Sequence, residues 1–258
     1  MQIEATYIGV ATVLLRIGEL TILTDPAFGA PGLTVTFAPG ARSSRLLGPA
    51  IAATDLPPID AVLLSHDRHI DNLDPEGRAL LPASGAVLTT RSGARRLRGN
   101  SVGLRPFESH ELARGPTRVT VTATPARHGP RFSLPFVGRV IGFLVTWQGQ
   151  RDGAIYISGD TVRYAGIDAI AARGPVGTAF LHMGGAALSP RGAKLTMTAR
   201  DAAEVTRTLG ARRVLPIHSD GWTHFRDDHA AIAATFAAAG LADTLHDWQR
   251  GDAVTWEA

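Results

Sequence analysis

The stretch Asp60–Asp74 constrains the fold most strongly, because it joins a buried strand directly to a dense group of candidate metal ligands. Its apolar start, the run AVLL at 61–64, predicts a buried strand. The polar residues that follow at once are His66, Asp67, His69, Asp71 and Asn72. A turn after a rigid strand lets imidazoles and carboxylates converge on one divalent metal ion. The alternative is a polar turn in which Asp71 or Asp74 caps the next helix.

Composition limits the kinds of protein that this chain can be. Its 258 residues fit one large domain or two small ones, and a 45% share of apolar residues suffices for a sizeable core. The formal net charge is +3, and almost all of the positively charged residues are Arg. The arginines are scattered except for a group at 91–98, which we interpret as the solvated face of a short helix. Without a basic stripe and interleaved aromatic residues, a nucleic-acid partner is disfavoured.

The sequence also gives expectations about metal chemistry and location. Because the chain has no Cys, disulfides and thiolate ligands are excluded, and a metal ion must be held by nitrogen and oxygen. The start MQIEATYIGV lacks the basic region and apolar core of a signal peptide. No apolar run approaches the ~20 residues that cross a bilayer. We therefore expect a cytoplasmic protein without a membrane partner.

Apolar and β-branched runs predict strands that alternate with helices. In the first half, we expect strands at 2–9, 11–17, 20–24, 61–64, 86–90 and 101–104, and helices at 75–81 and 92–98. In the second half, we expect strands at 118–124, 140–147, 154–158, 178–183 and 213–217, and helices at 164–173, 198–209 and 226–239. Residues 28–58 are rich in Gly, Pro and Ser without a sustained period, and we interpret them as an ordered lid in preference to a disordered insertion.

Four of the predicted strands end in residues that bind metals in other proteins. These residues are His66, His69 and Asp71 after the first strand, and His128, Asp160 and His218 after three later ones. The ends of neighbouring strands can share one edge of a sheet, whereas histidines of a packed core have no reason to follow strands so regularly. The set therefore predicts one metal site. Asp25, at the end of strand 20–24, either caps a turn or orients a metal-bound His.

In order and spacing, these motifs resemble the metallo-β-lactamase fold hydrolases. The likeness is greatest to the branch that includes ascorbate-6-phosphate lactonase and N-acylphosphatidylethanolamine phospholipase D. It covers nearly the whole chain, and its motifs are YIG at 7–9, LTDP at 23–26, SHDRHIDNLD at 65–74, ARHGP at 126–130, SGDT at 158–161 and PIH at 216–218. The resemblance implies an α+β fold, an αββα sandwich of two mixed sheets flanked by helices, with residues 1–258 as one domain.

The ligand turn departs from the His-x-His-x-Asp-His pattern of this family. The spacing from His66 to His69 is one residue longer than usual, and Asn72 stands at the final position. Read from the left, His66 is the first ligand and Arg68 or His69 is the second. Read from the right, the four places fall on Asp67, His69, Asp71 and Asn72. Both readings retain His69 and Asp71.

The resemblance also implies which residues hold the metal, Zn²⁺ or Mn²⁺, as one or two ions. One ion would be held by His66, His69 and His128, the other by Asp71 and His218, and Asp160 would bridge them. Asn72 offers an amide oxygen where an imidazole is usual, which would weaken the second site or abolish it.

Such a site suits hydrolysis, because a bound Zn²⁺ or Mn²⁺ lowers the pKa of water and polarises the bond under attack. Asp71 could take the proton of the nucleophile. His182 and His224 are candidates for substrate contact or leaving-group protonation, although each could instead be a packing residue. Arg127 could clamp an anionic substrate or remain solvated.

We therefore expect a hydrolase of a small-molecule substrate with an ester-like bond, either a lactone or a phosphodiester. The alternative is a non-catalytic metal-binding protein of the same fold, indicated by Arg68 and Asn72 in the ligand turn. Selectivity is expected in the loops at 28–58 and 129–139.

Overall fold

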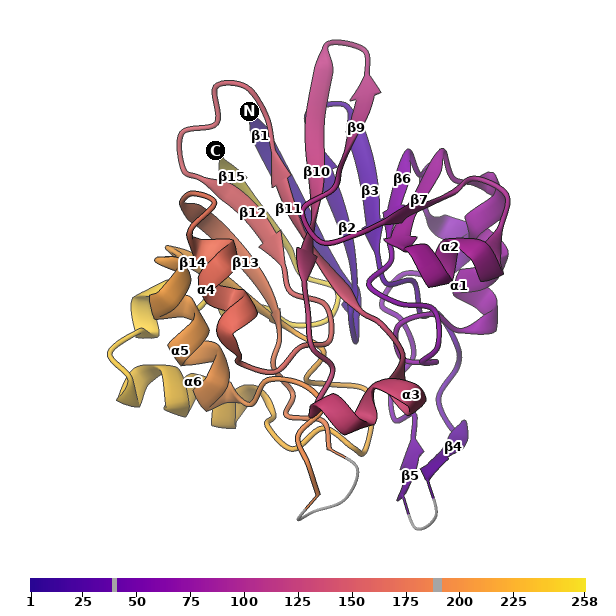
Figure 1. Ribbon diagram of the computed structural model, residues 1–258, viewed down its shortest axis with the longest axis vertical. Helices are drawn as coiled ribbons and strands as arrows, with labels where there is room; N and C mark the ends of the chain where they lie inside the picture. Colours follow the sequence, from indigo (N-terminus) through magenta and orange to yellow (C-terminus); the bar gives the residue numbers. More distant parts are fainter. Residues whose placement is uncertain (39–40, 188–191) are drawn as a thin grey trace.

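Two large β-sheets lie face to face at the centre of the computed structural model, which describes residues 1–38, 41–187 and 192–258 (Figure 1). In spatial order, the seven-stranded sheet consists of β15 (Ala253–Glu257), β1 (Gln2–Gly9), β2 (Thr12–Ile17), β3 (Leu20–Thr24), β6 (Ala61–Leu63), β7 (Ala86–Thr90) and β8 (Ser101–Leu104). The six-stranded sheet consists of β14 (Arg213–Ile217), β13 (Val176–His182), β12 (Ala154–Ile157), β11 (Ile141–Thr146), β10 (Thr117–Pro125) and β9 (Ser109–Arg114). A separate hairpin pairs β4 (Thr34–Ala38) with β5 (Ala41–Ser44).

Both large sheets are mixed. Strands β15, β1, β2 and β3 pair antiparallel, and β3, β6, β7 and β8 run parallel. In the other sheet, β9, β10, β11 and β12 pair antiparallel, and β12, β13 and β14 run parallel. Strands that run in one direction have their carboxyl ends at one edge of the sheet. Because β11 runs antiparallel to both β10 and β12, β10 runs in the same direction as β12, β13 and β14. The residues that follow these four strands therefore collect at a common edge.

Side chains alternate between the space separating the sheets and the outer faces. In β1, Ile3, Ala5 and Tyr7 are fully buried in the cluster between the sheets. In β11, Phe143 points into the same cluster, whereas Leu144 belongs to the cluster under the helices. This period of two fixes which face of each sheet carries the core.

Helices cover the outer face of each sheet (Figure 1). The six-stranded sheet is covered by α4 (Ala165–Ala171), α5 (Ala199–Leu209) and α6 (His229–Ala238). The seven-stranded sheet is covered by α1 (Pro75–Leu80) and α2 (Arg91–Leu97). The short α3 (Leu134–Val137) and the β4–β5 hairpin lie at the lower end in Figure 1. The expected αββα sandwich of the α+β class is confirmed.

Short 3₁₀ turns complete the described helical structure. They are η1 (Ala53–Asp55), η2 (Leu81–Ala83), η3 (Arg131–Ser133) and η4 (Ala242–Thr244). Within the described ranges, every helix is too short or too polar to cross a lipid bilayer.

Several elements differ from the sequence-based expectations. Strands β9 and β15 were not predicted, because each buries a single large side chain, Leu112 and Trp256 respectively, and lacks a clear alternation. The segment 28–58, expected to lack regular structure, contains the β4–β5 hairpin. The helix expected at 226–239 begins only at His229, because the Asp228 carboxylate accepts a hydrogen bond from the Ala231 N–H and caps it there.

Candidate metal centre

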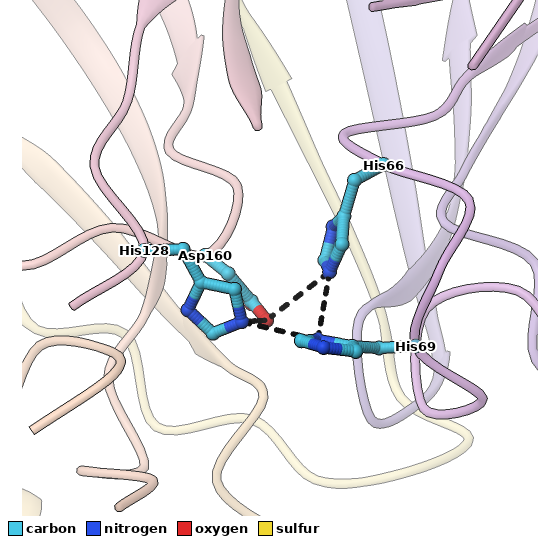
Figure 2. Close-up of side chains that lie close together, drawn as sticks. All are labelled: His66, His69, His128 and Asp160. Carbon is cyan, nitrogen blue, oxygen red and sulfur yellow. Dashed lines mark hydrogen bonds and ion pairs between the residues drawn. The ribbon is translucent and has the colours of Figure 1, made fainter. Parts of the chain in front are cut away.

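Histidines and carboxylates from both sheets meet at one edge of the sandwich. His66 and His69 follow β6 of the seven-stranded sheet, and His128 and Asp160 follow β10 and β12 of the six-stranded sheet. Figure 2 shows the four side chains pointing toward a common centre from opposite sides. One candidate ligand atom from each residue lies within 4.8 Å of all the others.

The separations between these atoms fit a single divalent ion. His69 Nδ1 lies 3.0 Å from both His66 Nε2 and His128 Nε2. Asp160 Oδ2 lies 3.8 Å from His66 Nε2 and 3.4 Å from His128 Nε2. Ligands about 2.0–2.1 Å from a tetrahedral zinc ion are themselves about 3.3 Å apart. The donor set is all nitrogen and oxygen, which suits Zn²⁺ and Mn²⁺.

Without a cation, the protons of the three imidazole rings cannot provide a hydrogen bond for every close pair of nitrogens in this cluster. His69 Nδ1 carries at most one proton, yet it faces the Nε2 atoms of both His66 and His128. One of these close nitrogen pairs therefore lacks a hydrogen bond when all three rings are neutral. A metal ion at the centre would accept all three lone pairs, so the residues present fit a metal.

The protonation states of the histidines also favour ligation. Burial lowers the pKa of His66 well below its ordinary value, and the neighbouring rings of His69 and His128 lower it further. Burial lowers the pKa of His128 to about 3 and lowers the pKa of His69 as well. Metal ligation requires neutral imidazole. The three rings are therefore in the form that binds a cation at neutral pH.

Hydrogen bonds to the outer nitrogens hold two of these rings in place. The Nδ1–H of His128 donates to the Leu195 carbonyl over 2.8 Å, which fixes the tautomer and leaves the Nε2 lone pair facing the centre. His66 Nδ1 lies 3.0 Å from Ser65 Oγ. Outer contacts of this kind are characteristic of metal-binding histidines.

A second group of residues lies on the other side of Asp160. Asp71 Oδ2 is 3.3 Å from His218 Nε2 and 3.2 Å from His224 Nε2. Asp160 Oδ1 is 3.6 Å from His218 Nδ1, while its Oδ2 faces the first cluster. The structure thus places Asp160 between the two groups. Among the described residues, Asp71 and His218 belong to no second set of three mutually close ligand atoms.

The two carboxylates have opposite pKa shifts. Burial raises the pKa of Asp160 well above its ordinary value, and the negative charges of Asp71 and Asp25 raise it further. Burial also acts to raise the pKa of Asp71, but the close imidazoles of His218 and His224 outweigh it and hold that pKa well below its ordinary range. Asp71 is therefore ionised at neutral pH, and a cation beside Asp160 would compensate the charge that burial disfavours.

The Asn72 side chain is fully buried beside these groups. Its amide partly offsets the raised pKa of Asp160 through a side-chain hydrogen bond, but the amide oxygen has no hydrogen-bond partner within the described part of the chain. Buried polar atoms without partners are uncommon and call for a specific cause. A ligand in this position would satisfy the amide oxygen.

The structure distinguishes between the two readings of the ligand turn. Asp67 points away from the cluster and accepts hydrogen bonds of 2.7 and 2.5 Å from Arg96. Asp67 therefore does not occupy a ligand position, and the reading that begins with His66 and continues with His69 fits. Arg96 pairs with this carboxylate while its side chain remains 41% exposed, so the group at 91–98 does lie on an exposed face of α2, as expected.

His182 and Asp25 form a buried layer behind the cluster. The His182 ring is fully buried, with Nε2 3.3 Å from Asp25 Oδ2 and Nδ1 3.1 Å from Ser158 Oγ. Asp25 also accepts a 2.7 Å hydrogen bond from the Ser65 N–H, directly before His66. This burial, with both ring nitrogens held by protein groups, fits the packing alternative for His182 better than contact with a substrate. Within the described part of the chain, the Asp25 carboxylate contacts His182 and the Ser65 N–H and not His66, His69 or His128, so the expectation that it orients a metal-bound His stays a prediction.

Backbone strain is concentrated at the same edge. His218, Asp25 and Val10 have φ values of 56°, 29° and 55°, in the left-handed region that side chains other than glycine rarely adopt. The His218 N–H donates to the Val10 carbonyl, and the Val10 N–H donates to Asp220. Such conformations cost of order 1–3 kcal/mol each and persist where the surroundings determine them.

Sequence reasoning missed a buried arginine that connects three segments of the site. Arg45 donates to the Gly29 carbonyl over 2.8 Å and to Asp74 over 2.8 Å, and its guanidinium lies 5.0 Å from the centre of the Trp222 ring. Asp74, not Asp71, caps α1 by accepting from the Gly77 N–H. Arg is usually exposed, so the residue type at position 45 did not indicate a buried side chain that joins these segments.

The comparison with protein families agrees with this geometry. The family described as the β-lactamase superfamily domain matches residues 21–219, which is most of the chain. The chain belongs to this family. The match includes all four residues of the cluster and the second group up to His218.

Curated relatives of this superfamily member are similar over most of its length. A UPF0173 metal-dependent hydrolase from Exiguobacterium sp. is 27% identical over 244 residues, covering 92% of the chain and 94% of that protein. A UPF0173 metal-dependent hydrolase from Pelotomaculum thermopropionicum is 28% identical over 145 residues, covering 53% of the chain and 59% of that protein. The second match thus spans less than two thirds of the relative.

Solved structures share the fold of this superfamily member. An isothiocyanate hydrolase from Delia radicum gut bacteria has a TM-score of 0.82 at 21% identity, covering 99% of the chain and 100% of that structure. A possible metal-dependent hydrolase from Veillonella parvula has a TM-score of 0.81 at 19% identity, covering 98% and 99%. The expected metallo-β-lactamase fold is confirmed.

Proposed function

We propose that this protein is a metal-dependent hydrolase that cleaves an ester-like bond, a lactone or a phosphodiester, in a small molecule. The observation that carries the proposal is the convergence of His66, His69, His128 and Asp160 from two sheets on one centre. Membership of the β-lactamase superfamily and relatives named metal-dependent hydrolases support the same activity. The likeness of the sequence motifs to the lactonase and phospholipase D branch supports the choice of bond.

The proposed metal ligands are those expected from the sequence. His66, His69 and His128 would hold one Zn²⁺ or Mn²⁺, together with Asp160. A second ion would lie between Asp160, Asp71 and His218, with the Asn72 amide in place of an imidazole. The second ion would be held more weakly, because fewer close ligand atoms surround its site. When bound, such ions supply Lewis acidity and lower the pKa of water.

The side chains have distinct proposed roles in hydrolysis. The oxygen of water bonds to the acyl carbon or phosphorus, the bond to the leaving oxygen breaks, and one proton moves from the water to that oxygen. Asp71 is ionised and accepts the proton. His224, 3.2 Å from Asp71 and with 12% of its side chain exposed, passes the proton at the rim of the site. His182 keeps Asp25 in position.

The alternative is a metal-binding protein of the same fold without turnover. The specific observation in its favour is Asn72, which takes the place of an imidazole ligand in the turn that carries Asp71. Arg68, which is exposed, does not stand in a ligand position and so gives this alternative no support.

Metal analysis combined with a substrate screen tests the proposal. The purified protein is expected to hold one or two metal ions and to hydrolyse at least one lactone or phosphodiester. Asp160→Ala is expected to lose turnover and metal, whereas Asp168→Ala, a change of the same kind on exposed α4, is expected to keep both. One tightly held ion with no turnover on any substrate would favour the non-catalytic alternative.

A further inference from the structure

A large cleft beside the metal cluster is lined by arginine. The cleft has a volume of about 900 Å³, and His128 is part of its lining, so it adjoins the cluster. Its arginines come from separate segments and are Arg91, Arg95, Arg105, Arg127, Arg131 and Arg139. The first two belong to α2 on the seven-stranded sheet, and the last three belong to the segment that follows β10. The cleft therefore lies between the two halves of the sandwich.

These positive charges are not neutralised inside the cleft. Among the described residues that line it, none is Asp or Glu. Within the described part of the chain, Arg91 makes a long contact of 4.0 Å with Glu108, and the other five arginines form no ion pair. Like charges repel when they are gathered together, so a concave arrangement of this kind concentrates anions.

Arg127 gives a second, independent indication of an anionic ligand. Its guanidinium lies 4.7 Å from the centre of the Tyr164 ring, which holds it over the cleft. Its Nε is buried and has no hydrogen-bond partner among the described residues. A buried guanidinium donor is normally paired, and a bidentate oxyanion is the partner that matches its planar geometry.

The rest of the lining is mostly apolar. Leu104, Pro106, Val140 and Ile141 contribute to the walls, and Tyr164 adds an aromatic face. A ligand with an apolar body and a multiply charged end would therefore find both kinds of contact. The volume is in the range of small-molecule sites.

We propose that this cleft binds the anionic end of the substrate, a phosphate monoester or another group with two negative charges, and holds the scissile bond beside His128. Calling the ligand a substrate rests on the proposed hydrolase function, but the anion site itself does not. The expected clamp by Arg127 becomes part of a site formed by six arginines from both sheets.

Binding of 1-naphthyl phosphate tests the site without requiring turnover. Its affinity is measured by calorimetry for the zinc-loaded protein and for the protein after removal of metal with a chelator, with neutral 1-naphthol as the matched ligand. The cleft variant is Arg95→Gln, Arg131→Gln, Arg139→Gln. The control variant, Arg16→Gln, Arg118→Gln, Arg200→Gln, removes the same charge from exposed positions outside the cleft.

The phosphate is expected to bind both forms of the protein, more tightly than the naphthol. The cleft variant is expected to bind 1-naphthyl phosphate about tenfold or more weakly, which is the effect of losing one charged hydrogen bond. The control variant is expected to bind it as tightly as the natural protein. High salt is expected to weaken binding to the natural protein.

Three results would overturn the inference. Equal losses in both triple variants would show an effect of net charge only, and equal affinities for phosphate and naphthol would show an apolar site. Tighter binding of a single-stranded oligonucleotide of about 15 nucleotides, lost in the cleft variant, would indicate a nucleic-acid interface instead. Failure of the proposed function is distinguishable, because phosphate binding would persist without any hydrolysis. Failure of the anion site would leave hydrolysis of neutral esters intact.

Discussion

At the scale of single residues, the site depends on which positions of the ligand turn face the metal. His66→Ala is expected to weaken metal binding by more than roughly 100-fold. Removal of a residue that only orients a metal ligand costs up to about 100-fold, and loss of the ligand itself is expected to cost more. The reason is that His66 Nε2 is one of four atoms that surround the centre. Metal content after dialysis and the Kd from competition with a chromophoric chelator measure the effect.

The matched change next to it is Asp67→Asn. It is expected to leave the metal content unchanged, because the Asp67 carboxylate faces Arg96 and not the cluster. The free energy of unfolding of the metal-free protein is expected to fall by about 1 kcal/mol or less, since Arg96 is partly exposed and the ion pair is screened. Loss of metal in Asp67→Asn would contradict the arrangement of the turn described above.

The sequence alone could not choose between the two readings of this turn. His69 and Asp71 fit either one, and the extra residue between His66 and His69 can be absorbed only if the geometry of the turn is known. The deciding contact comes from Arg96, 29 positions away in α2. Local spacing carries no information about that partner, whereas the types of the ligand residues are evident from the sequence.

At the scale of elements, Arg45 connects β5, the turn before α1 and the loop after β14. Arg45→Met is expected to lower the free energy of unfolding by about 3–5 kcal/mol, because Asp74 would remain buried beside it without its cationic partner. Urea unfolding of the metal-free protein measures this loss. The double change Arg45→Met, Asp74→Asn is expected to cost much less than the sum of the single changes, because the two side chains interact directly. Additive losses would contradict a direct pair.

The start of α5 provides a prediction about pH. Burial acts to raise the pKa of Asp201, but hydrogen bonds from Lys194 and Thr198 outweigh it and lower the pKa. A lowered pKa in the folded protein stabilises it above the ordinary pKa of about 3.9, and this contribution is lost as the pH falls through the folded value. Asp201→Asn is therefore expected to cost about 1 kcal/mol at pH 7, as for loss of a helix cap, and progressively less below pH ~4.

Urea unfolding of the metal-free protein at several pH values measures this difference. Asp168→Asn in α4, which removes a carboxylate paired only at the surface, is the control and is expected to show little dependence on pH. A constant difference between the natural protein and Asp201→Asn across the whole range would contradict the assignment.

Elements with a strong local pattern were predictable, and elements defined by distant partners were not. Strand β6 combines an apolar run with the ligand turn and was expected from the sequence. Strand β15 pairs with β1 at the opposite end of the chain, and its single buried large residue, Trp256, gives no period. The arginines of the cleft lie in segments that only the tertiary structure brings together.

At the scale of the whole molecule, the metal cluster is a link between the two sheets. His66 and His69 follow a strand of the seven-stranded sheet, and His128 and Asp160 follow strands of the six-stranded sheet (Figure 2). In the unfolded chain these pairs are separated by more than 50 positions and form no site. A metal ion therefore binds the folded state in preference to the unfolded state, and its binding free energy adds to stability.

This linkage gives a quantitative expectation for thermal unfolding. At a free metal concentration of about 1,000 times Kd, the folded state gains about 4 kcal/mol. For a chain of this size each kcal/mol raises Tm by about 2–4 °C, so zinc is expected to raise Tm by about 8–16 °C over the chelator-treated protein. In Asp160→Ala the increase is expected to be small at the same zinc concentration, because the fourth ligand, supplied by the six-stranded sheet, is missing. An equal increase in both proteins would mean that zinc binds elsewhere, and the two sheets would then be held together by their shared apolar core alone.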